Sequence, residues 1–471
     1  MAERADNPQR QDPAKTPNDL RWENERLRRE VERLRRENER LKKELEAARR
    51  AGKRQAAPFS KGAPIPHAKR PGRRVGRRHG RHGHREPPTH IDETIDVPLP
   101  AHCPYCGGAL AETRIADQIQ EDLPVVRPHV RRFCVHIGCC RHCGRRVQGR
   151  YSLQTSDALG AASTHLGPQA TSLIVLLNKY LGVSHGKVAT LLRDWFGLTV
   201  RPSAVTHALH RAARQAAPTY AALRDAIRAS PVVSPDETSW KVAGHLQWLW
   251  AFATPSVILY AIQAGRGFPQ AAAVLGADFD DVLVRDGWAP YRRFAQAAHQ
   301  TCLAHLLRRS RQLASDHPRA AWPARVAEVL QQALAVRDRR DNDNMTAHGA
   351  AIARGRLFND LTDLVNCPVR TAALQRFATH LAVELPAVFG FLFDPTIDAT
   401  NWRGEQALRP AVVNRKVSGG NGSPRGAATQ QILASVVHTA RLRGLDARAV
   451  LVDLLRARRP IVSPAVTLAP Q

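Results

Sequence analysis

The chain has 471 residues, which is too long for one compact core and leaves room for several modules. Lys and Arg together number 70 and Asp and Glu number 42, so the formal net charge is +28. This balance favours a nucleic acid partner; the alternative is a solvated basic surface. No apolar run approaches the roughly 18 residues of a membrane span, and the polar N-terminus lacks a signal peptide. We therefore expect a cytoplasmic protein with reduced thiols and no membrane partner.

Residues 1–48 contain a predicted coiled-coil helix. Over 20–48, leucines recur at every seventh residue, and Asn or apolar residues fill the companion positions. The leucines are Leu20, Leu27, Leu34 and Leu41, and the companions are Asn24, Val31, Asn38 and Leu45. Two Asn residues in the seam weaken it but fix its register and favour two strands. We expect a parallel homodimer, with a single solvated helix as the alternative.

A basic linker is expected at 49–90. Between 49 and 85 it holds 13 Lys or Arg and no Asp or Glu, with repeated Gly and Pro. Such a segment cannot bury enough apolar surface to fold, so we expect a disordered tether that follows a DNA backbone or lies in a minor groove. The arginines expected to contact DNA are Arg73, Arg74, Arg77 and Arg78. A purely solubilising tether is the alternative.

Residues 91–155 are expected to form a zinc-binding module, because six of the eight cysteines lie between Cys103 and Cys143. Each CxxC knuckle directs two thiolates at one point, and two knuckles complete a tetrahedral structural zinc site. The predicted ligands are Cys103, Cys106, Cys140 and Cys143. Other possible ligands leave the exact set open, namely Cys134, His136, Cys139 and His142. Free thiols are the alternative.

Residues 156–228 are expected to be helical. Residues 184–214 resemble a helix-turn-helix, in which Ser184 caps one helix and Pro202 opens the next. The second helix carries Arg201 and Arg211 on polar faces that suit phosphates or base edges. Because any short antiparallel helix pair shares this pattern, a structural hairpin is the alternative.

From residue 229 the pattern changes to strands. A strand PVVSPDETSWKV is followed by a hairpin, HLQWLWAFAT and SVILYAI, then by DVLVRDGW and by AHQT leading into a helix. Residues 306–395 and 426–457 are expected to be helical. The chain is therefore predicted to be multidomain α+β, with an α/β core at 229–305 and 396–471 and a helical insertion at 306–395 between its parts.

Three carboxylates stand where a metal site could form. Asp236 is expected at the end of a β run, Asp286 ends an apolar strand, and Glu405 begins a helix. Such side chains can converge at a sheet edge, and their oxygens suit Mg²⁺ or Mn²⁺. Two ions about 3.5–4 Å apart would support phosphodiester chemistry. On the residues alone, three unrelated surface carboxylates are the alternative.

Long blocks around these carboxylates resemble the catalytic blocks of the IS66 family of insertion-sequence transposases. They are SPDETSWKVAGHLQWLWAF, LVRDGWAPYRRF with HQTCLAHLLRR, and NWRGEQALRPAVVNRKVSGGNGSPRGAATQQILASVVHTARLRG. The resemblance extends upstream through LGPQATSLIVLLNKYLGVSHGKVATLL, the paired cysteines, the basic linker and the heptads. It covers nearly the whole chain from about residue 20 to 457.

The resemblance implies a DDE transposase with an RNase H-like core, in which Asp236, Asp286 and Glu405 are the catalytic residues and hold the divalent cations. It implies cleavage at terminal inverted repeats, joining of the 3′ ends to target DNA, and a bacterial, nucleoid-associated setting. Small accessory proteins of the same element are further implied partners. Cys302 and His305 match the family's Cys-x-x-His feature, which we expect to serve packing or positioning.

One segment departs from the family pattern. Where the family has two Asn and then Ala-Glu-Arg, this chain has Asn401, Trp402, Arg403, Gly404, Glu405 and Gln406. An impaired copy that only binds DNA is therefore the alternative function, and a structure-specific nuclease is a third.

Basic residues follow the third carboxylate. We expect them to contact DNA, because the carboxylate site needs positive charge nearby to hold its polyanion. They are Arg409, Arg415 and Lys416. The glycine-rich SGGNGSPRG that follows could let the backbone approach a phosphate. A solvated loop beside a basic helix is the alternative.

Overall fold

The computed structural model describes residues 22, 25–41, 86–342 and 344–467. The chain divides into two units, Met1–Thr94 and Ile95–Gln471. In the first, residues 25–41 are helical, as the heptads predict. Their apolar seam is about half exposed within one chain, at Leu27, Val31, Leu34 and Leu41. The pairing of two such helices stays a prediction. Several predicted residues lie outside the described ones, namely Leu20, Asn24, Leu45, Arg73, Arg74, Arg77 and Arg78.

The cysteine-rich segment contains a short antiparallel pair of strands. β1 (Ile137–Cys139) pairs with β2 (Arg146–Gln148), with Cys139 opposite Arg146. The second CxxC knuckle forms the connection between the two strands.

Helices precede the main sheet. They are η2 (Gly160–Ala162), α2 (Pro168–Val175), the π-helical η3 (Leu176–Tyr180), α3 (His185–Phe196) and α4 (Pro202–Arg228). The Ser184 side chain accepts a hydrogen bond from the Lys187 backbone N–H, and Gly197 ends α3 with φ of 62°. The helix α4 extends past the helix-turn-helix-like segment to Arg228, the last residue of the stretch expected to be helical, because buried Leu223 and Ile227 continue its apolar face.

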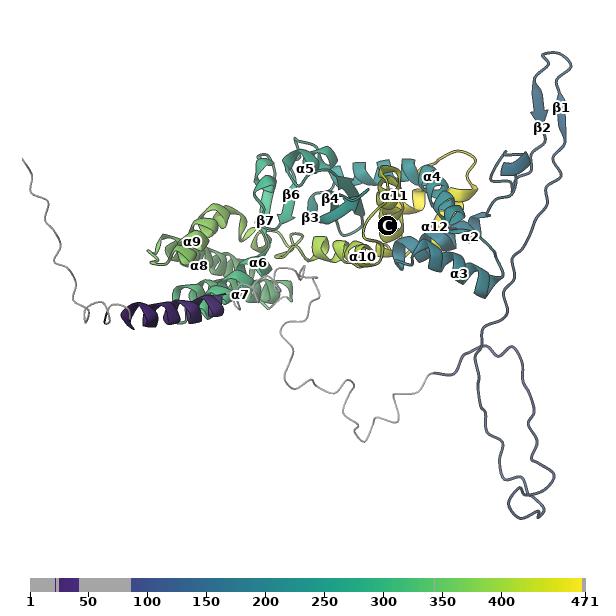
Figure 1. Cartoon of the computed structure of the whole chain (residues 1–471), viewed down its shortest axis with the longest axis horizontal. Coiled ribbons are helices and arrows are strands. Elements are labelled where there is room, and N and C mark those ends of the chain that lie inside the picture. The colour runs from purple at the N-terminus through teal and green to yellow at the C-terminus, as the bar shows by residue number, and fades with distance from the viewer. Residues whose placement is uncertain (1–21, 23–24, 42–85, 343, 468–471) are drawn as a thin grey trace, which may run out of the picture. The chain divides into compact units, whose positions relative to one another are not determined.

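The main sheet has five strands in the order β5-β4-β3-β6-β7 (Figure 1). They are β3 (Val232–Val242), β4 (His245–Ala253), β5 (Ile258–Gln263), β6 (Val282–Arg285) and β7 (Ala298–Thr301). β3, β4 and β5 are antiparallel neighbours, whereas β6 is parallel to both β3 and β7. All five occur where the sequence pattern predicts strands.

Alternation along the strands gives the sheet two apolar faces. Trp250 and Phe252 belong to a core shared with α4, α11 (Pro424–Leu442) and α12 (Ala447–Arg456). Leu249 and Ala251 belong to a second core shared with α10 (Trp402–Ser418) and α11. α10 packs against β3 and β4 (Figure 1). This packing carries the start of α10 to the centre of the sheet.

The edge strand β5 is covered by polar side chains of α11. Backbone N–H groups of β5 donate to Gln431, Ser435 and Thr439 at 2.9 to 3.1 Å. These bonds satisfy an edge that would otherwise be open to another strand.

The expected helical stretch follows β7 and has its own apolar core. It comprises α6 (Leu303–Asp316), α7 (Trp322–Asp341), α8 (Ala347–Asn366), α9 (Ala372–Glu384), η5 (Leu385–Ala387) and η6 (Gly390–Leu392). Shorter elements lie elsewhere, namely α5 (Phe268–Leu275), η4 (Ala289–Arg293) and α13 (Pro464–Thr467). The mixed α+β class is thus confirmed. No helix in the described part of the chain combines the length and apolar character needed to cross a bilayer.

Candidate active site

Asp236 lies in the middle of β3, opposite Ala251 of β4. One oxygen, Oδ1, accepts the backbone N–H of Glu237 at 2.8 Å. Burial raises the pKa of the Asp236 carboxyl well above its usual value, and the nearby carboxylates of Glu237, Asp286 and Glu405 raise it further. Asp236 therefore lies close enough to Asp286 and Glu405 for their charges to affect its pKa.

Asp286 follows β6 directly. Its Oδ1 accepts the backbone N–H of Trp288 at 2.9 Å, and its carbonyl accepts Arg285 Nη1 at 3.0 Å. Arg285 is itself buried and pairs with Glu384 Oε2 at 2.7 Å. Arg292 pairs with the other oxygen of Glu384 at 2.8 Å. The turn that carries Asp286 is thus fixed by an ion-pair network that reaches the end of α9.

Glu405 lies in the first turn of α10. The residue before it, Gly404, lies so close to β3 that an added Cβ would stand 3.1 Å from the Asp236 Cβ. Asn401, at the start of α10, donates from Nδ2 to the Pro235 carbonyl at 2.7 Å. The departure from the family pattern at residue 404 therefore coincides with a close approach of α10 to β3.

The structure thus places Asp286 and Glu405 near enough to Asp236 to raise its pKa, although the three come from elements far apart in the sequence. Among the described residues, the three carboxylates do not form a group whose ligand atoms all lie within 4.8 Å of one another. A further pair approaches the same place. Cys302 Sγ accepts the Asn401 backbone N–H at 3.2 Å, and His305 Nε2 lies 3.8 Å from Glu405 Oε1.

Glu237 is a site residue that the sequence analysis missed. Its fully buried carboxylate pairs with Arg266 at 2.5 Å and accepts the Tyr291 hydroxyl at 2.5 Å. Burial raises the pKa of Glu237, although Tyr291 and Arg266 oppose that effect. The Arg266 guanidinium also lies 4.1 Å from the centre of the Trp288 ring. A buried carboxylate next to Asp236 in a strand of mixed polarity gave no separate sequence signal.

The basic residues expected to contact DNA have different surroundings. Arg201, Arg211 and Lys416 are exposed, as is Arg409. Arg415 instead turns toward β3, where its Nη1 donates to Thr238 Oγ1 at 2.9 Å and to Ser239.

The glycine-rich stretch after α10 also approaches β3. An added Cβ at Gly420, whose φ is 121°, would lie 2.3 Å from the Lys241 carbonyl oxygen. Asn421 donates its backbone N–H to that same carbonyl at 2.8 Å. The close backbone approach that the glycines permit is therefore to a strand.

Both CxxC knuckles form tight turns. Gly107 N–H donates to the Cys103 carbonyl and Gly144 N–H to the Cys140 carbonyl, each at 2.9 Å. Backbone N–H groups of Tyr105 and Cys106 lower the pKa of Cys103, and those of Cys143 and His142 lower the pKa of Cys140. Within residues 86–342 and 344–467, however, the four thiols are not gathered at one point. A zinc ion joining the knuckles stays a prediction.

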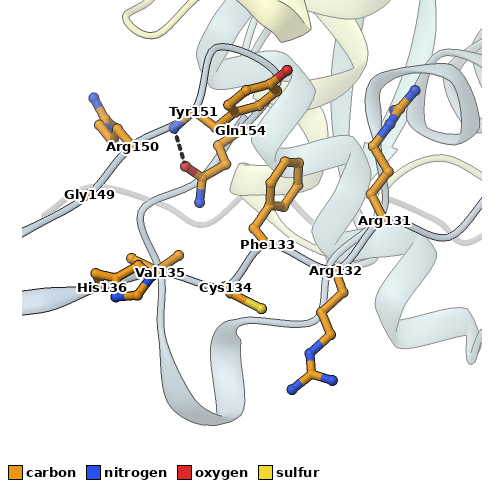
Figure 2. Close-up of a pocket in the computed structure, with 10 residues that line it drawn as sticks. All are labelled: Arg131, Arg132, Phe133, Cys134, Val135, His136, Gly149, Arg150, Tyr151 and Gln154. Atoms are coloured by element: carbon orange, nitrogen blue, oxygen red, sulfur yellow. Dashed lines mark hydrogen bonds between the residues drawn. The ribbon is translucent and has the colours of Figure 1, made fainter.

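A pocket lies beside the β1–β2 pair, and its lining was not anticipated. Figure 2 shows the Phe133 and Tyr151 rings, whose centres are 6.1 Å apart, with Arg131 and Arg132 nearby. The dashed line in Figure 2 joins the Tyr151 N–H to Gln154 Oε1 at 2.6 Å. Arginines beside aromatic rings suit phosphates and unstacked bases.

Comparison with known proteins agrees with the resemblance of the sequence blocks. The model of the family described as "Transposase IS66 family" matches residues 163–429, which include all three carboxylates. "Uncharacterized protein y4jD" of Sinorhizobium fredii is 26% identical over 419 residues, covering 81% of this chain and 79% of the relative. "Uncharacterized protein y4qI" of the same organism is 28% identical over 228 residues, covering 42% and 41%. The chain belongs to the IS66 transposase family.

Proposed function

We propose that this chain is a DNA transposase that hydrolyses phosphodiesters at the ends of its element and joins the freed 3′ ends to target DNA. The observation that supports this most strongly is the meeting of Asp236, Asp286 and Glu405. Carboxylates scattered over the surface would not both contribute to the raised pKa of Asp236.

Mg²⁺ or Mn²⁺ fits this donor set, because all the ligand atoms are carboxylate oxygens. Asp236, Asp286 and Glu405 would hold the ions, whose charge would offset the repulsion that raises the pKa of Asp236. Bound there, the metal would supply Lewis acidity at the scissile phosphate.

The chain's own side chains and amides supply positioning. The Glu237 and Trp288 N–H groups each hold one oxygen of an aspartate, which leaves the second oxygen of Asp236 and of Asp286 for other ligands. Behind β3, the ion pair of Glu237 with Arg266 keeps that strand in place. Catalysis of phosphoryl transfer rests mostly on such positioning and electrostatics.

The sheet supports an RNase H-like core, as the family resemblance implies. Its central β3 has antiparallel neighbours on one side and the parallel β6 and β7 on the other. Two of the carboxylates stand on or just after these adjacent strands, and α10 brings the third. The helices α6 to α9 would then be an insertion between β7 and α10.

Binding of the element ends would involve several surfaces. The net charge of +28 and the exposed Arg201, Arg211 and Lys416 support phosphate contacts. The half-exposed apolar seam of residues 25–41 supports a homodimer. Structural zinc at the knuckles, the arginine-rich linker and small accessory proteins complete the proposal, which is set in a bacterial cytoplasm.

Strand transfer with oligonucleotides that carry the element ends tests the proposal. In Mg²⁺, Asp286→Asn should lower the rate by roughly 10² or more, since it removes one ligand of the metal. Asp280→Asn, at an exposed aspartate shortly before β6, is the matched control and should retain the wild-type rate.

The alternatives give different results. Equal rates for Asp286→Asn and wild type would remove the catalytic assignment. If the wild type also bound DNA without any reaction, the result would favour the alternative of a catalytically impaired copy, which the departures at Trp402 and Gly404 suggest. Cleavage without joining would favour a nuclease.

A further inference from the structure

The N-termini of α6 and α10 bring three different donor atoms together. Cys302 is the residue before α6, His305 lies in the first turn of α6, and Glu405 lies in the first turn of α10. The thiol sulfur, an imidazole nitrogen and a carboxylate oxygen all lie within 4.8 Å of one another. Asp236 and Asp286 do not belong to this group.

The sulfur of Cys302 is surrounded by N–H groups. Its side chain is fully buried, and the Asn401 N–H donates to Sγ at 3.2 Å. The backbone N–H groups of Ala304 and His305 also hydrogen-bond to the thiol. Burial raises the pKa of the Cys302 thiol, and these N–H groups oppose that effect. A metal ion would bind the thiolate form.

Among the residues that the structure describes, none satisfies both ring nitrogens of His305. Its Nε2 lies 3.8 Å from Glu405 Oε1, which is too far for a hydrogen bond. Its Nδ1 is buried and has no hydrogen-bond partner among the described residues. Asn401 Oδ1 likewise has no hydrogen-bond partner within the described part of the chain. Unsatisfied buried polar atoms are costly.

We propose that Cys302, His305 and Glu405 bind one transition-metal ion of the zinc class. One sulfur, one nitrogen and one oxygen ligand suit Zn²⁺ better than Mg²⁺. Zinc bonds of about 2.0–2.3 Å place ligand atoms roughly 3.5 Å apart, so small side-chain rotations close the group. Three protein ligands leave a fourth position for water or an anionic oxygen.

Because Glu405 is shared, occupancy of this site would have a consequence for catalysis. A zinc-class ion between Cys302 and His305 draws the Glu405 carboxylate away from the oxygen-rich site of the two aspartates. Zinc should therefore inhibit Mg²⁺-dependent strand transfer. This consequence rests on the proposed function, whereas the binding itself does not.

Metal content tests the binding. The full-length chain is stripped with a chelator, dialysed against buffered Zn²⁺, and analysed for zinc per chain. Cys302→Ser and His305→Gln should each hold one zinc fewer than wild type, while Cys367→Ser, which removes an exposed thiol, should match wild type. In Cys302→Ser the hydroxyl can still accept the Asn401 N–H, and circular dichroism shows whether each variant folds.

X-ray absorption at the zinc edge gives a second measurement that does not depend on variants. The wild type should show nitrogen and oxygen ligands beside sulfur, whereas a spectrum of sulfur ligands alone would overturn the proposal. Unchanged zinc content in both Cys302→Ser and His305→Gln would overturn it as well.

Asp286→Asn separates this inference from the proposed function. It should retain the full zinc content although strand transfer is lost, because Asp286 is not a ligand of this site. Zinc added to the wild type in Mg²⁺ should lower its rate, and the ratio of rates with and without zinc should be closer to one for Cys302→Ser. Equal ratios would overturn the inhibitory role.

Discussion

Gly404 lies directly against Asp236: a Cβ at residue 404 would be 3.1 Å from the Asp236 Cβ and 2.6 Å from Asn401 Oδ1. Asn401 cannot easily move aside, since its Nδ2 is bonded to the Pro235 carbonyl at 2.7 Å. The distance between α10 and β3, and with it the position of Glu405, therefore depends on a residue without a side chain.

Gly404→Ala should push α10 away from β3. We expect a loss of about 1–3 kcal/mol in the free energy of unfolding, which is usual for overpacking, and slower Mg²⁺-dependent strand transfer. Gly355→Ala is the control, because this glycine lies in α8 with nothing within 4 Å of an added Cβ. Urea unfolding measures the stability of both variants, and a strand-transfer assay measures their rates. A Gly404→Ala protein with wild-type stability and rate would show that the close approach has no role.

Glu384→Gln should destabilise the protein strongly. The substitution leaves Arg285, which is 2% exposed, without its counter-charge, and breaking a buried pair in this way costs about 3–5 kcal/mol. Glu328→Gln, at an exposed position of α7, should change little. Thermal unfolding of both variants at neutral pH checks the expectation, which a small shift for Glu384→Gln would contradict.

The same carboxylate predicts a pH dependence. Burial alone would raise the pKa of Glu384, but Arg285 and Thr301 outweigh it, so the pKa lies below its usual value. A lowered carboxyl pKa stabilises the fold at every pH above the ordinary value and loses that contribution as the pH falls through the folded value. The stability gap between wild type and Glu384→Gln should therefore narrow below about pH 4. A stability difference between wild type and Glu384→Gln that grows as the pH falls would contradict this prediction.

Lys179 predicts a dependence of the same sign at higher pH. Its ammonium is buried in η3 with Gln430 Oε1 as a partner at 2.8 Å, and burial lowers its pKa to about 7. The unfolded chain then binds a proton that the folded chain lacks between pH 7 and the usual lysine value near 10, so stability should rise with pH over that range. Lys179→Met should be more stable than wild type below pH 7, and the difference should shrink toward pH 10.

Lys187→Met, at an exposed lysine of α3, provides the baseline for that comparison. Chemical unfolding at several pH values separates the variants. A constant difference between Lys179→Met and wild type across the range would mean that Lys179 does not titrate there.

Alanine substitutions of the neighbouring residues Arg415 and Lys416 should have different effects. Arg415 donates to Thr238 and Ser239, so Arg415→Ala should lower thermal stability. Lys416 is exposed, so Lys416→Ala should leave thermal stability unchanged. It should reduce the slope of log affinity for DNA against log salt concentration by about 1, the effect of losing one phosphate contact. Binding isotherms at several salt concentrations measure the slope, and interchanged results would contradict this division.

The knuckles give a prediction about zinc. Cys140→Ser should lose the knuckle zinc and increase proteolysis within residues 91–155, because structural zinc contributes folding energy directly. Cys367→Ser is again the thiol control. Zinc content and protease resistance that match wild type would show that the knuckles do not share an ion.

Much of the fold follows from local patterns in the sequence. The apolar segment HLQWLWAFAT predicts β4, and Ser184 and Pro202 predict the starts of α3 and α4, as the structure confirms. α4 ends at Arg228, where the stretch expected to be helical also ends, and buried Leu223 and Ile227 continue its apolar face to that point.

Long-range side-chain pairs could not be predicted. Glu384 and Arg285 are 99 residues apart, and nothing local to either residue indicates the other. Cys302 and His305 show a recognisable spacing, but only the fold brings Glu405 to them. The basic residues after Glu405 look equivalent in sequence, yet the helix turns Arg415 inward and Lys416 outward.

Asp236, Asp286 and Glu405 are proposed to hold divalent cations against DNA. Crystals grown with element-end DNA and Mn²⁺ test it most directly, through the anomalous scattering of manganese. The account predicts anomalous peaks within about 2.2 Å of oxygens from all three side chains, and their loss in Asp286→Asn. Manganese bound elsewhere, or no peak among these three carboxylates while DNA is in place, would contradict it.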